Sequence, residues 1–155
     1  MDTPSTHAGR VIAGVDGSVH SARVLRTAAV LAGALNLRLD VFTCWDRSEI
    51  DLAAHIPTGV VAEGDPLEAE AARLVEDAVE RVFGLERPRT LATFVRYGHP
   101  SQILVQESAS ACLLVVGRRG QGGFAGLRLG SVSSACIAHA RCPVLVVNSD
   151  VRPRG

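Results

Sequence analysis

Lysine is absent from the sequence, which has one tryptophan and one tyrosine, and aromatic residues make up 4% of the chain. The absence of lysine excludes a P-loop kinase or GTPase, because that motif needs a lysine after its glycines to neutralise the β and γ phosphates. All sixteen basic residues are arginines, and they balance sixteen acidic residues. Such a neutral chain has no overall field that attracts nucleic acid or an anionic membrane, so we expect neither as a partner.

Hydrophobic runs are short. No apolar run reaches the roughly 18 to 20 residues that a membrane span needs, and the opening segment, MDTPSTHAGR, contains no hydrophobic signal. We therefore expect a soluble, cytoplasmic protein. The length of 155 residues and the 47% of hydrophobic residues fit a single domain with its own core. We place this domain at residues 10–148, with tails at 1–9 and 149–155.

Residues that support catalysis or metal binding are few and scattered. The sequence has four cysteines, Cys44, Cys112, Cys136 and Cys142, without CxxC spacing. They lie in or beside apolar stretches, so we expect buried thiols. Cys136, His139 and Cys142 do not complete the four-ligand set of a structural zinc site. The nucleophile elbow Gly-x-Ser-x-Gly is also absent, so we expect no catalytic residue and no protein-held metal.

Two hydrophobic patterns alternate along the chain. Short continuous runs predict buried strands, and apolar residues spaced three and four apart predict amphipathic helices. We expect strands at residues 11–15, 37–45, 90–97, 112–116 and 144–147. We expect helices at residues 18–36, 65–84, from 100 onward, and 132–140. Apolar strands separated by helices predict an α/β fold, with a doubly wound parallel sheet and helices on both faces.

A glycine-rich segment joins the fourth expected strand to the last helix. Six glycines occur in the stretch from Gly117 to Ser131. Glycine adopts positive φ and lets other atoms approach the backbone, so such a loop can turn its amides toward an anion. The amides of residues 132–134 start the helix and lack intrahelical acceptors, so phosphate is the expected occupant. Positive charge comes from Arg118, Arg119 and Arg128, of which Arg119 is included in the expected site. The alternative is a flexible surface loop without a ligand.

Asp16 lies at the carboxyl end of the first expected strand, and Gly17 and Ser18 follow it. In doubly wound sheets the ligand lies at the carboxyl ends of the strands, where the winding reverses. With the strand order 3-2-1-4-5, Asp16 and Gly117 face one crevice. A carboxylate there accepts hydrogen bonds from ribose hydroxyls or from the amine of a base. The alternative is a turn in which Ser18 caps the first helix.

The glycine spacing matches a known fingerprint. Gly117, Gly120, Gly130 and Ser131 reproduce the pattern Gly, two residues, Gly, nine residues, Gly, then Ser or Thr. Supporting stretches are VIAGVDGS at 11–18, LLVVGRRG at 113–120 and GLRLGSVSSACIAHARCPVLVV at 126–147. The chain therefore resembles the nucleotide-binding branch of the universal stress protein family. The resemblance implies a Rossmann-like sheet of five parallel strands that binds ATP.

The resemblance also implies which residues form the site. Those expected around adenine and ribose are Gly14, Val15, Asp16 and Cys44, with Val116 and Gly117 nearby. Those expected at the phosphates are Gly120, Gly130, Ser131, Val132 and Ser133. A divalent ion, Mg or Mn, is expected only through the bound nucleotide. Two positions depart from the family pattern: Cys112 stands where relatives often have Asp, and Arg118 where they often have Ser.

Three functions stay open at this point. The first is an ATP-binding stress-response or signalling module with little or slow hydrolysis, because no base for an attacking water can be identified. The second is a nucleotide hydrolase or phosphotransferase in which Ser131, Ser133 and the arginines stabilise phosphate charge. The third is a homodimeric scaffold that works without nucleotide. A homodimer is expected through the last strand, which forms an apolar sheet edge.

Overall fold

The computed structural model describes residues 9–46, 64–118 and 129–148. Within them, five parallel strands form one sheet in the order β3-β2-β1-β4-β5. The strands are β1 (Arg10–Gly14), β2 (Arg38–Trp45), β3 (Leu91–Tyr97), β4 (Leu113–Gly117) and β5 (Val144–Val147). The predicted Rossmann-like, doubly wound sheet and its strand order are confirmed.

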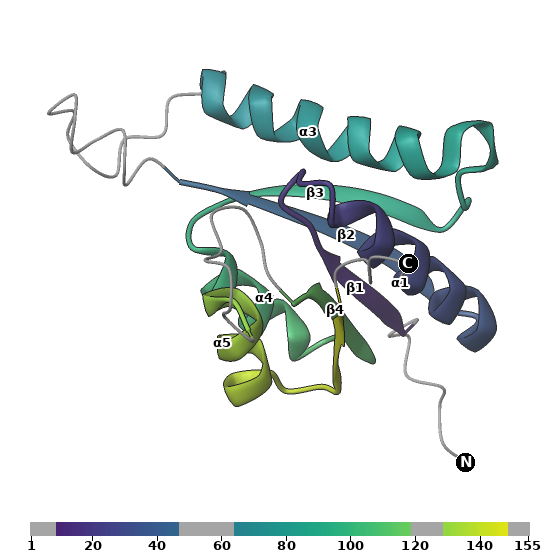
Figure 1. The fold of residues 1–155 in the computed structure, drawn as a ribbon, viewed down its shortest axis with the longest axis vertical. Helices are drawn as coiled ribbons and strands as arrows, with labels where there is room; N and C mark the ends of the chain where they lie inside the picture. Colours follow the sequence, from purple (N-terminus) through teal and green to yellow (C-terminus); the bar gives the residue numbers. More distant parts are fainter. Residues whose placement is uncertain (1–8, 47–63, 119–128, 149–155) are drawn as a thin grey trace, which may run out of the picture.

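Helices cover both faces of this sheet. They are α1 (Ser21–Leu35), α3 (Pro66–Phe83), α4 (Pro100–Ser108) and α5 (Ser131–His139), and a 3-10 helix, η1 (Gly84–Glu86), follows α3. Helices α1 and α3 lie on one face, and α4 and α5 lie on the other (Figure 1). Successive strand residues point to opposite faces, so Val11 packs under α1 whereas Ile12 packs toward α4. Both faces are buried, which explains why the strands are apolar throughout.

The first helix starts later than its sequence predicts. Ser18 is not the N-cap: α1 begins at Ser21, and its N-cap is His20, which makes no side-chain cap bond. Gly17 has a φ of 78°, and a Cβ there would lie 3.3 Å from the Cβ of Leu74. The chain therefore makes a tight turn that only glycine fits easily before the helix begins. The carboxylate of Asp16 replaces the serine as the acceptor, since its Oδ1 receives the Ser18 amide at 2.9 Å.

The other helix ends agree closely with their sequence signals. Asn36 closes α1 in the left-handed conformation, with a φ of 54°. Asp65 is the N-cap of α3, where its side chain accepts the amide of Leu67 at 2.8 Å, and Gly84 is the C-cap. Local capping chemistry thus fixes these boundaries, as the sequence predicts.

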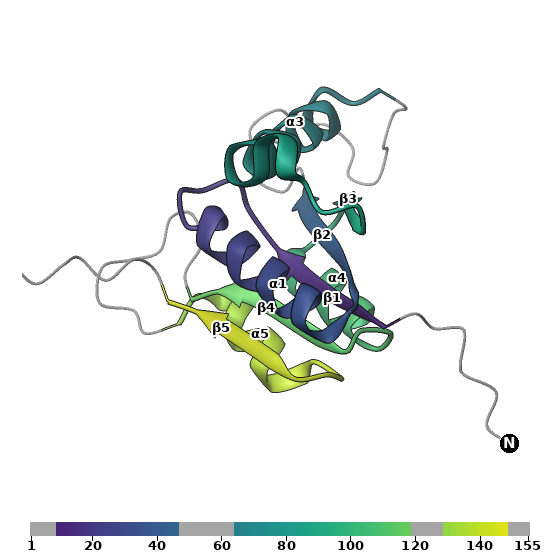
Figure 2. The ribbon, with the colours of Figure 1, turned by 90° about the vertical axis from the view of Figure 1, so that its right-hand side faces the viewer.

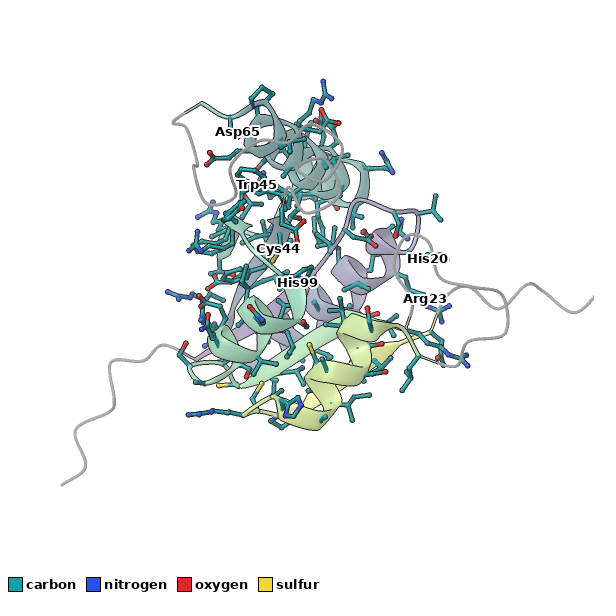
Figure 3. The ribbon with its side chains drawn as sticks, turned by 90° about the vertical axis from the view of Figure 1, so that its left-hand side faces the viewer. His20, Arg23, Cys44, Trp45, Asp65 and His99 are labelled. Carbon is teal, nitrogen blue, oxygen red and sulfur yellow. The ribbon has the colours of Figure 1, made fainter. Side chains whose placement is uncertain are left out.

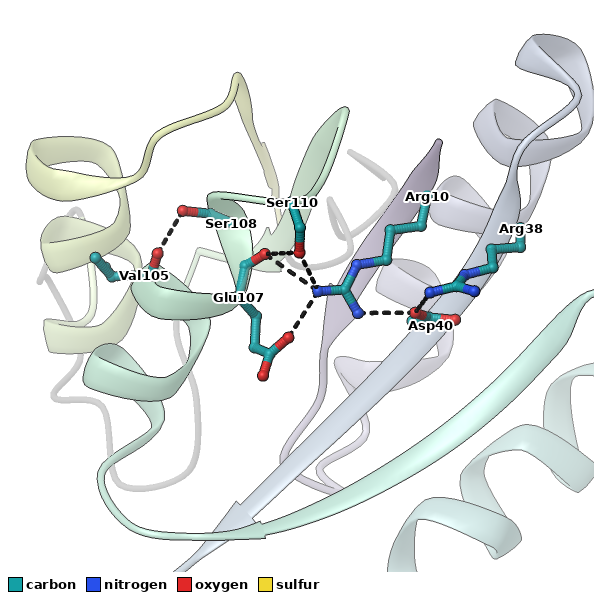
Figure 4. A network of polar contacts seen from close by, with 7 residues as sticks. All are labelled: Arg10, Arg38, Asp40, Val105, Glu107, Ser108 and Ser110. Atoms are coloured by element: carbon teal, nitrogen blue, oxygen red, sulfur yellow. Dashed lines mark hydrogen bonds and ion pairs between the residues drawn. The ribbon is translucent and has the colours of Figure 1, made fainter. Parts of the chain in front are cut away.

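Charged residues are buried at the amino ends of β1 and β2 (Figure 4). Arg10 is 8% exposed and donates to Asp40 at 2.9 Å, to Glu107 at 2.6 Å and to Ser110 at 2.8 Å. Arg38 adds a second ion pair to Asp40, at 3.2 Å. A buried charge is costly unless it is paired. These five residues, here called the amino-end network, therefore tie the end of α4 to the start of the sheet.

The prediction of buried thiols holds for only part of the cysteines. Cys136 is buried, Cys44 and Cys142 are half-buried, and Cys112 is exposed. Cys112 directly precedes β4, where a turn after α4 leads the chain into the sheet. Its side chain is exposed, although its neighbours Leu113 and Ala111 pack against the two core clusters.

The edges of the sheet are β3 and β5 (Figure 2). β5 pairs with β4 in parallel register, with Val144 opposite Leu114 and Val146 opposite Val116. In the described parts of the chain, no helix combines the length and the apolar composition needed to cross a membrane.

Candidate functional site

The winding of the sheet reverses between β1 and β4. The chain first builds β2 and β3 on one side of β1, and then adds β4 and β5 on its other side. β1 and β4 are paired neighbours, with Val11 opposite Leu113 and Ala13 opposite Val115. The carboxyl ends of both strands therefore lie side by side at the same end of the sheet, which is where doubly wound sheets bind their ligands. At this end of the sheet, Asp16 follows β1 and Arg118 follows β4.

Asp16 is held by its own turn. Its Oδ1 accepts the Ser18 amide at 2.9 Å and the Ser21 hydroxyl at 3.3 Å. Ser21 is only 4% exposed, so its hydroxyl is fixed inside the fold. The carboxylate thus caps the turn and also stands in a set orientation at the winding reversal. The sequence argument missed Ser21, although the spacing Asp-x-Ser-x-x-Ser in DGSVHS carries the signal.

Two valines of the predicted site have their side chains in the core. Val15 is 8% exposed and Val116 is 2% exposed. The backbone of Val15 is fixed on both sides, because its amide donates to Phe42 at 3.0 Å and its carbonyl accepts the Thr43 hydroxyl at 3.1 Å. A ligand at the strand ends can therefore meet these residues only through their main chain.

Two glycines of the predicted site have different structural reasons. A Cβ at Gly14 would lie 2.8 Å from Cδ1 of Leu104, so close packing of α4 against β1 explains glycine there. Gly130 has a φ of −76° and a ψ of 170°, an extended conformation that any residue adopts. Positive φ, which the sequence argument offered as a reason for glycine in this segment, does not apply to Gly130.

The start of α5 supplies backbone donors. Its first backbone bond runs from the Ser134 amide to the Gly130 carbonyl at 3.0 Å. The amides of Ser131, Val132 and Ser133 precede that bond and have no acceptor within the helix. Ser131 is exposed, and Gly130 and Val132 are half-buried. Partly accessible amides at the positive end of a helix form the kind of site that holds an anion.

The hydroxyl of Ser133 is used inside the fold. Its Oγ lies 3.0 Å from the Arg118 carbonyl and 3.1 Å from the Gly130 carbonyl, and the residue is 1% exposed. A hydroxyl has one proton, so it donates to one of these two carbonyls at a time. The Gly130 amide also donates to the Arg118 carbonyl, at 2.7 Å. Ser133 therefore closes the connection between β4 and α5, and its amide is the part suited to a phosphate.

Cys44 lies near the end of β2, close to the start of α4 (Figure 3). Burial raises the pKa of its thiol to about 11, although Arg96 opposes the shift and Glu107 adds to it. The thiol is therefore neutral near pH 7 and is not a thiolate nucleophile. A neutral thiol behaves as a small apolar group with a weak donor, which suits the contact with adenine that the family resemblance implies.

Trp45 ends β2, and His99 follows the end of β3 (Figure 3). The amide of Gly98 donates to the Trp45 carbonyl at 2.8 Å, which joins the two strand ends. Nε2 of His99 lies 4.0 Å from Oδ2 of Asp46, and the imidazole is 68% exposed. This separation is longer than a hydrogen bond, so the pair is not a positioned acid and base.

The expected site is thus brought together only in part. Arg119 and Gly120 lie outside the described residues. In the ranges 9–46, 64–118 and 129–148, no group of three or more His, Cys, Asp or Glu side chains is arranged to hold a metal ion. The described part of the site offers a carboxylate on one strand end and helix amides beside the next.

Known proteins share both the sequence pattern and the fold. The model of the universal stress protein family matches residues 7–148. Universal stress protein Rv2623 of Mycobacterium tuberculosis is 33% identical over 153 residues, which cover 96% of this chain and 48% of that protein. Universal stress protein Rv2005c of the same organism is 32% identical over 149 residues, covering 92% and 46%. The chain spans about half the length of the curated relatives it matches.

Solved structures share the fold at lower identity. A universal stress protein in complex with cAMP has a TM-score of 0.70 and 23% identity, covering 92% of this chain and 98% of that one. Universal stress protein UspA from Lactobacillus plantarum has a TM-score of 0.68 and 22% identity, covering 90% and 97%. The family model and the curated relatives agree, and this chain belongs to the universal stress protein family.

Proposed function

We propose that this chain is a nucleotide-binding module that binds ATP at the carboxyl ends of β1 and β4, with little or slow hydrolysis. The observation that carries the proposal is the pairing of β1 with β4, which sets the Asp16 turn and the segment leading to α5 at one edge. The turn offers a carboxylate to hydroxyl or amine donors, and the helix offers amides to an anion. A nucleotide has such hydroxyl and amine donors on its ribose and base, and such an anion in its phosphates. The related protein in complex with cAMP supports this ligand class.

The proposed contacts divide between side chains and main chain. Adenine and ribose lie near Gly14, Val15, Asp16 and Cys44, with Val116 and Gly117 beside them. The phosphates lie against Arg119, Gly120, Gly130, Ser131, Val132 and Ser133, and Mg or Mn accompanies them. Val15, Val116 and Ser133 contribute their backbone, because their side chains are buried.

The energy of such a site is sufficient for micromolar binding. Two or three charge-assisted hydrogen bonds contribute about 1.5 to 3 kcal/mol each. A micromolar ligand needs ~8 kcal/mol in total. The base and the ribose then supply the remainder through apolar contact and through Asp16. Adenosine, the nucleoside without phosphates, should consequently bind much more weakly than ATP.

Slow turnover follows from the side chains at this edge. Rate enhancement needs groups that bind the transition state more strongly than the substrate, or a base within reach of the attacking water. In the described part of the chain, His99 stands 4.0 Å from its carboxylate neighbour and is largely exposed, and the Cys44 thiol is neutral. The module then acts by occupancy, as a cytoplasmic stress-response or signalling protein.

A homodimer through β5 is part of the proposal. β5 is an edge strand of four apolar residues, and an apolar edge with open amides favours pairing with a second chain. A two-fold axis beside β5 would join the sheets of two protomers. Light scattering at micromolar concentration should give the mass of two chains, and a monomeric mass would contradict the dimer.

The function is tested by titrating ligand-free protein with ATP, ADP, AMP and cyclic AMP by calorimetry in the presence of Mg. We expect micromolar ATP binding that is lost in Asp16→Ala, with phosphate release well below about 1 per second. Faster release would make the chain a nucleotide hydrolase. An absence of binding to all four compounds would leave a scaffold that works without nucleotide.

A further inference from the structure

Cys112 and Cys142 precede neighbouring strands in matching positions. Leu114 and Val144 are opposite each other in the β4–β5 ladder, and each cysteine lies two residues before one of them. The Leu114 amide donates to the Pro143 carbonyl at 3.0 Å, so pairing extends to the residue next to Cys142. Neighbouring strands lie about 4.8 Å apart, within the ~4.4 to 6.8 Å between Cα atoms that disulfides span.

The two sulfur atoms differ in their surroundings. Sγ of Cys142 donates to the Pro143 carbonyl at 3.4 Å, and its side chain packs against the core cluster that contains Leu114 of β4. Cys112 is exposed, and its Sγ lies on the side of Gly9, where a Cβ would be 2.7 Å away. An exposed side chain changes rotamer within nanoseconds, so Cys112 can turn from Gly9 toward β5.

The electrostatics agree with this proximity. Burial raises the pKa of the Cys142 thiol, and the charge of Cys112 raises it further. Burial, with a smaller contribution from Cys142, raises the pKa of the Cys136 thiol to about 11. Cys136 has no exposed surface, so an oxidant in solution reaches Cys112 first.

We propose that Cys112 and Cys142 are an oxidation site, at which a peroxide joins the amino ends of β4 and β5 through a disulfide. The Cys112 thiolate attacks one oxygen of hydrogen peroxide, the O–O bond breaks, and a sulfenic acid and water form after protonation. Cys142 then attacks the sulfenic sulfur, the S–O bond breaks, and a second water leaves. Two thiols thus lose two electrons and two protons, and the peroxide is reduced to two waters.

The disulfide closes a loop of the chain that contains β4, α5 and the entry to β5. A cross-link of this kind restricts the unfolded chain. The midpoint of thermal unfolding should therefore rise on oxidation and return when a reductant is added. This proposal stands whether or not the chain binds ATP.

The test treats the reduced full chain with hydrogen peroxide and maps its peptides by mass spectrometry without reduction. We expect a linked peptide pair containing Cys112 and Cys142, with the loss of two hydrogen atoms from one chain. Cys112→Ser and Cys142→Ser should each lose the linked pair and the thermal shift. Cys136→Ala, the matched control, should retain both.

Three outcomes would overturn the proposal. The first is a link that involves Cys136 or Cys44 in place of the proposed pair. The second is a link between two chains, recognised as a reducible dimer on a gel. The third is conversion of Cys112 to sulfinic acid with Cys142 still a free thiol.

Discussion

The two ends of the sheet treat polar groups in opposite ways. At the amino ends, Arg10 uses its guanidinium on Asp40, Glu107 and Ser110, all within the fold (Figure 4). At the carboxyl ends, the amides that start α5 have no acceptor in their helix. The first end uses its charges to hold the fold, whereas the second end is where we propose that backbone amides bind another molecule.

This difference separates stability from binding. The amino-end network lies at the opposite end of the strands from the Asp16 turn and the start of α5. Mutations at sites far apart usually act independently. Changes at one end should thus alter the free energy of unfolding, and changes at the other should alter nucleotide affinity. Four substitutions test this separation.

The largest expected effect is on binding, from Gly130→Glu. A carboxylate at the start of α5 repels phosphate and occupies its amides, so ATP affinity should fall by about 4 kcal/mol, roughly a thousand-fold. Calorimetry measures the loss, and circular dichroism checks the fold. Gly130→Ala is the matched control, because the extended backbone accepts alanine. Unchanged affinity in Gly130→Glu would remove α5 from the site.

The next effect is on stability, from Arg10→Met. The change leaves the carboxylate of Asp40, which is 1% exposed, with Arg38 as its only ion-pair partner among the residues that the structure describes. The free energy of unfolding should fall by about 3 kcal/mol, the usual cost of breaking a buried pair. Urea denaturation measures it. Arg38→Met, at a side chain that is 49% exposed, should cost below about 1 kcal/mol. An altered ATP affinity in Arg10→Met would contradict the separation of the two ends.

A smaller effect should come from Ser21→Ala. The alanine removes the hydrogen bond that the Ser21 hydroxyl donates to Oδ1 of Asp16, so ATP affinity should fall by about 1 kcal/mol, or several-fold. Ser21→Thr keeps the hydroxyl and should bind nearly as well as the native chain. In the Asp16→Ala background, Ser21→Ala should add nothing to the loss. An additive loss would show that Ser21 acts separately from Asp16.

The smallest effect concerns Glu76, which accepts hydrogen bonds from Arg87 and Thr93 on the surface. This exposed group is compared with the buried amino-end network. Hydrogen bonds from Arg87 and Thr93 lower the pKa of Glu76 below its ordinary value of 4.5. The stability that this group adds is therefore complete above about pH 4.5 and is lost as the pH falls through the lowered pKa. Glu76→Gln should flatten that acid limb in urea titrations by less than about 1 kcal/mol. If Glu76→Gln lowered the free energy of unfolding as much as Arg10→Met, burial would not explain the larger cost expected at Arg10.

The sequence predicts the sheet well because its signals are local. Continuous apolar runs locate the strands within one or two residues, and Asn36 and Asp65 end or start helices through their own backbone and side chains. The start of α1 is missed because Ser18 competes with Asp16, and a turn at Gly17 decides the outcome. That decision depends on packing against Leu74, which lies far along the chain.

The candidate site is predicted less completely, for the same reason. The glycine and serine pattern locates the start of α5 to within one residue, since the start of a helix is a local property. The pattern does not reveal that the Ser133 hydroxyl serves the Arg118 carbonyl. The amino-end network is also beyond a reading of motifs, because Arg10 and Glu107 are 97 positions apart and meet only when α4 packs.

Arg118 is hydrogen-bonded to both of the proposed binding regions, the dimer interface and the phosphate site. Its amide donates to the Val147 carbonyl of β5 at 2.9 Å, and its carbonyl accepts the Gly130 amide at the start of α5. One residue is therefore bonded both to the sheet edge proposed for dimerisation and to the helix end proposed for phosphate. If dimerisation and nucleotide binding both displace Arg118, the two equilibria are coupled. Thermodynamic reciprocity then requires that each changes the free energy of the other by the same amount. ATP affinity would then depend on protein concentration, without a hinge or a moving domain.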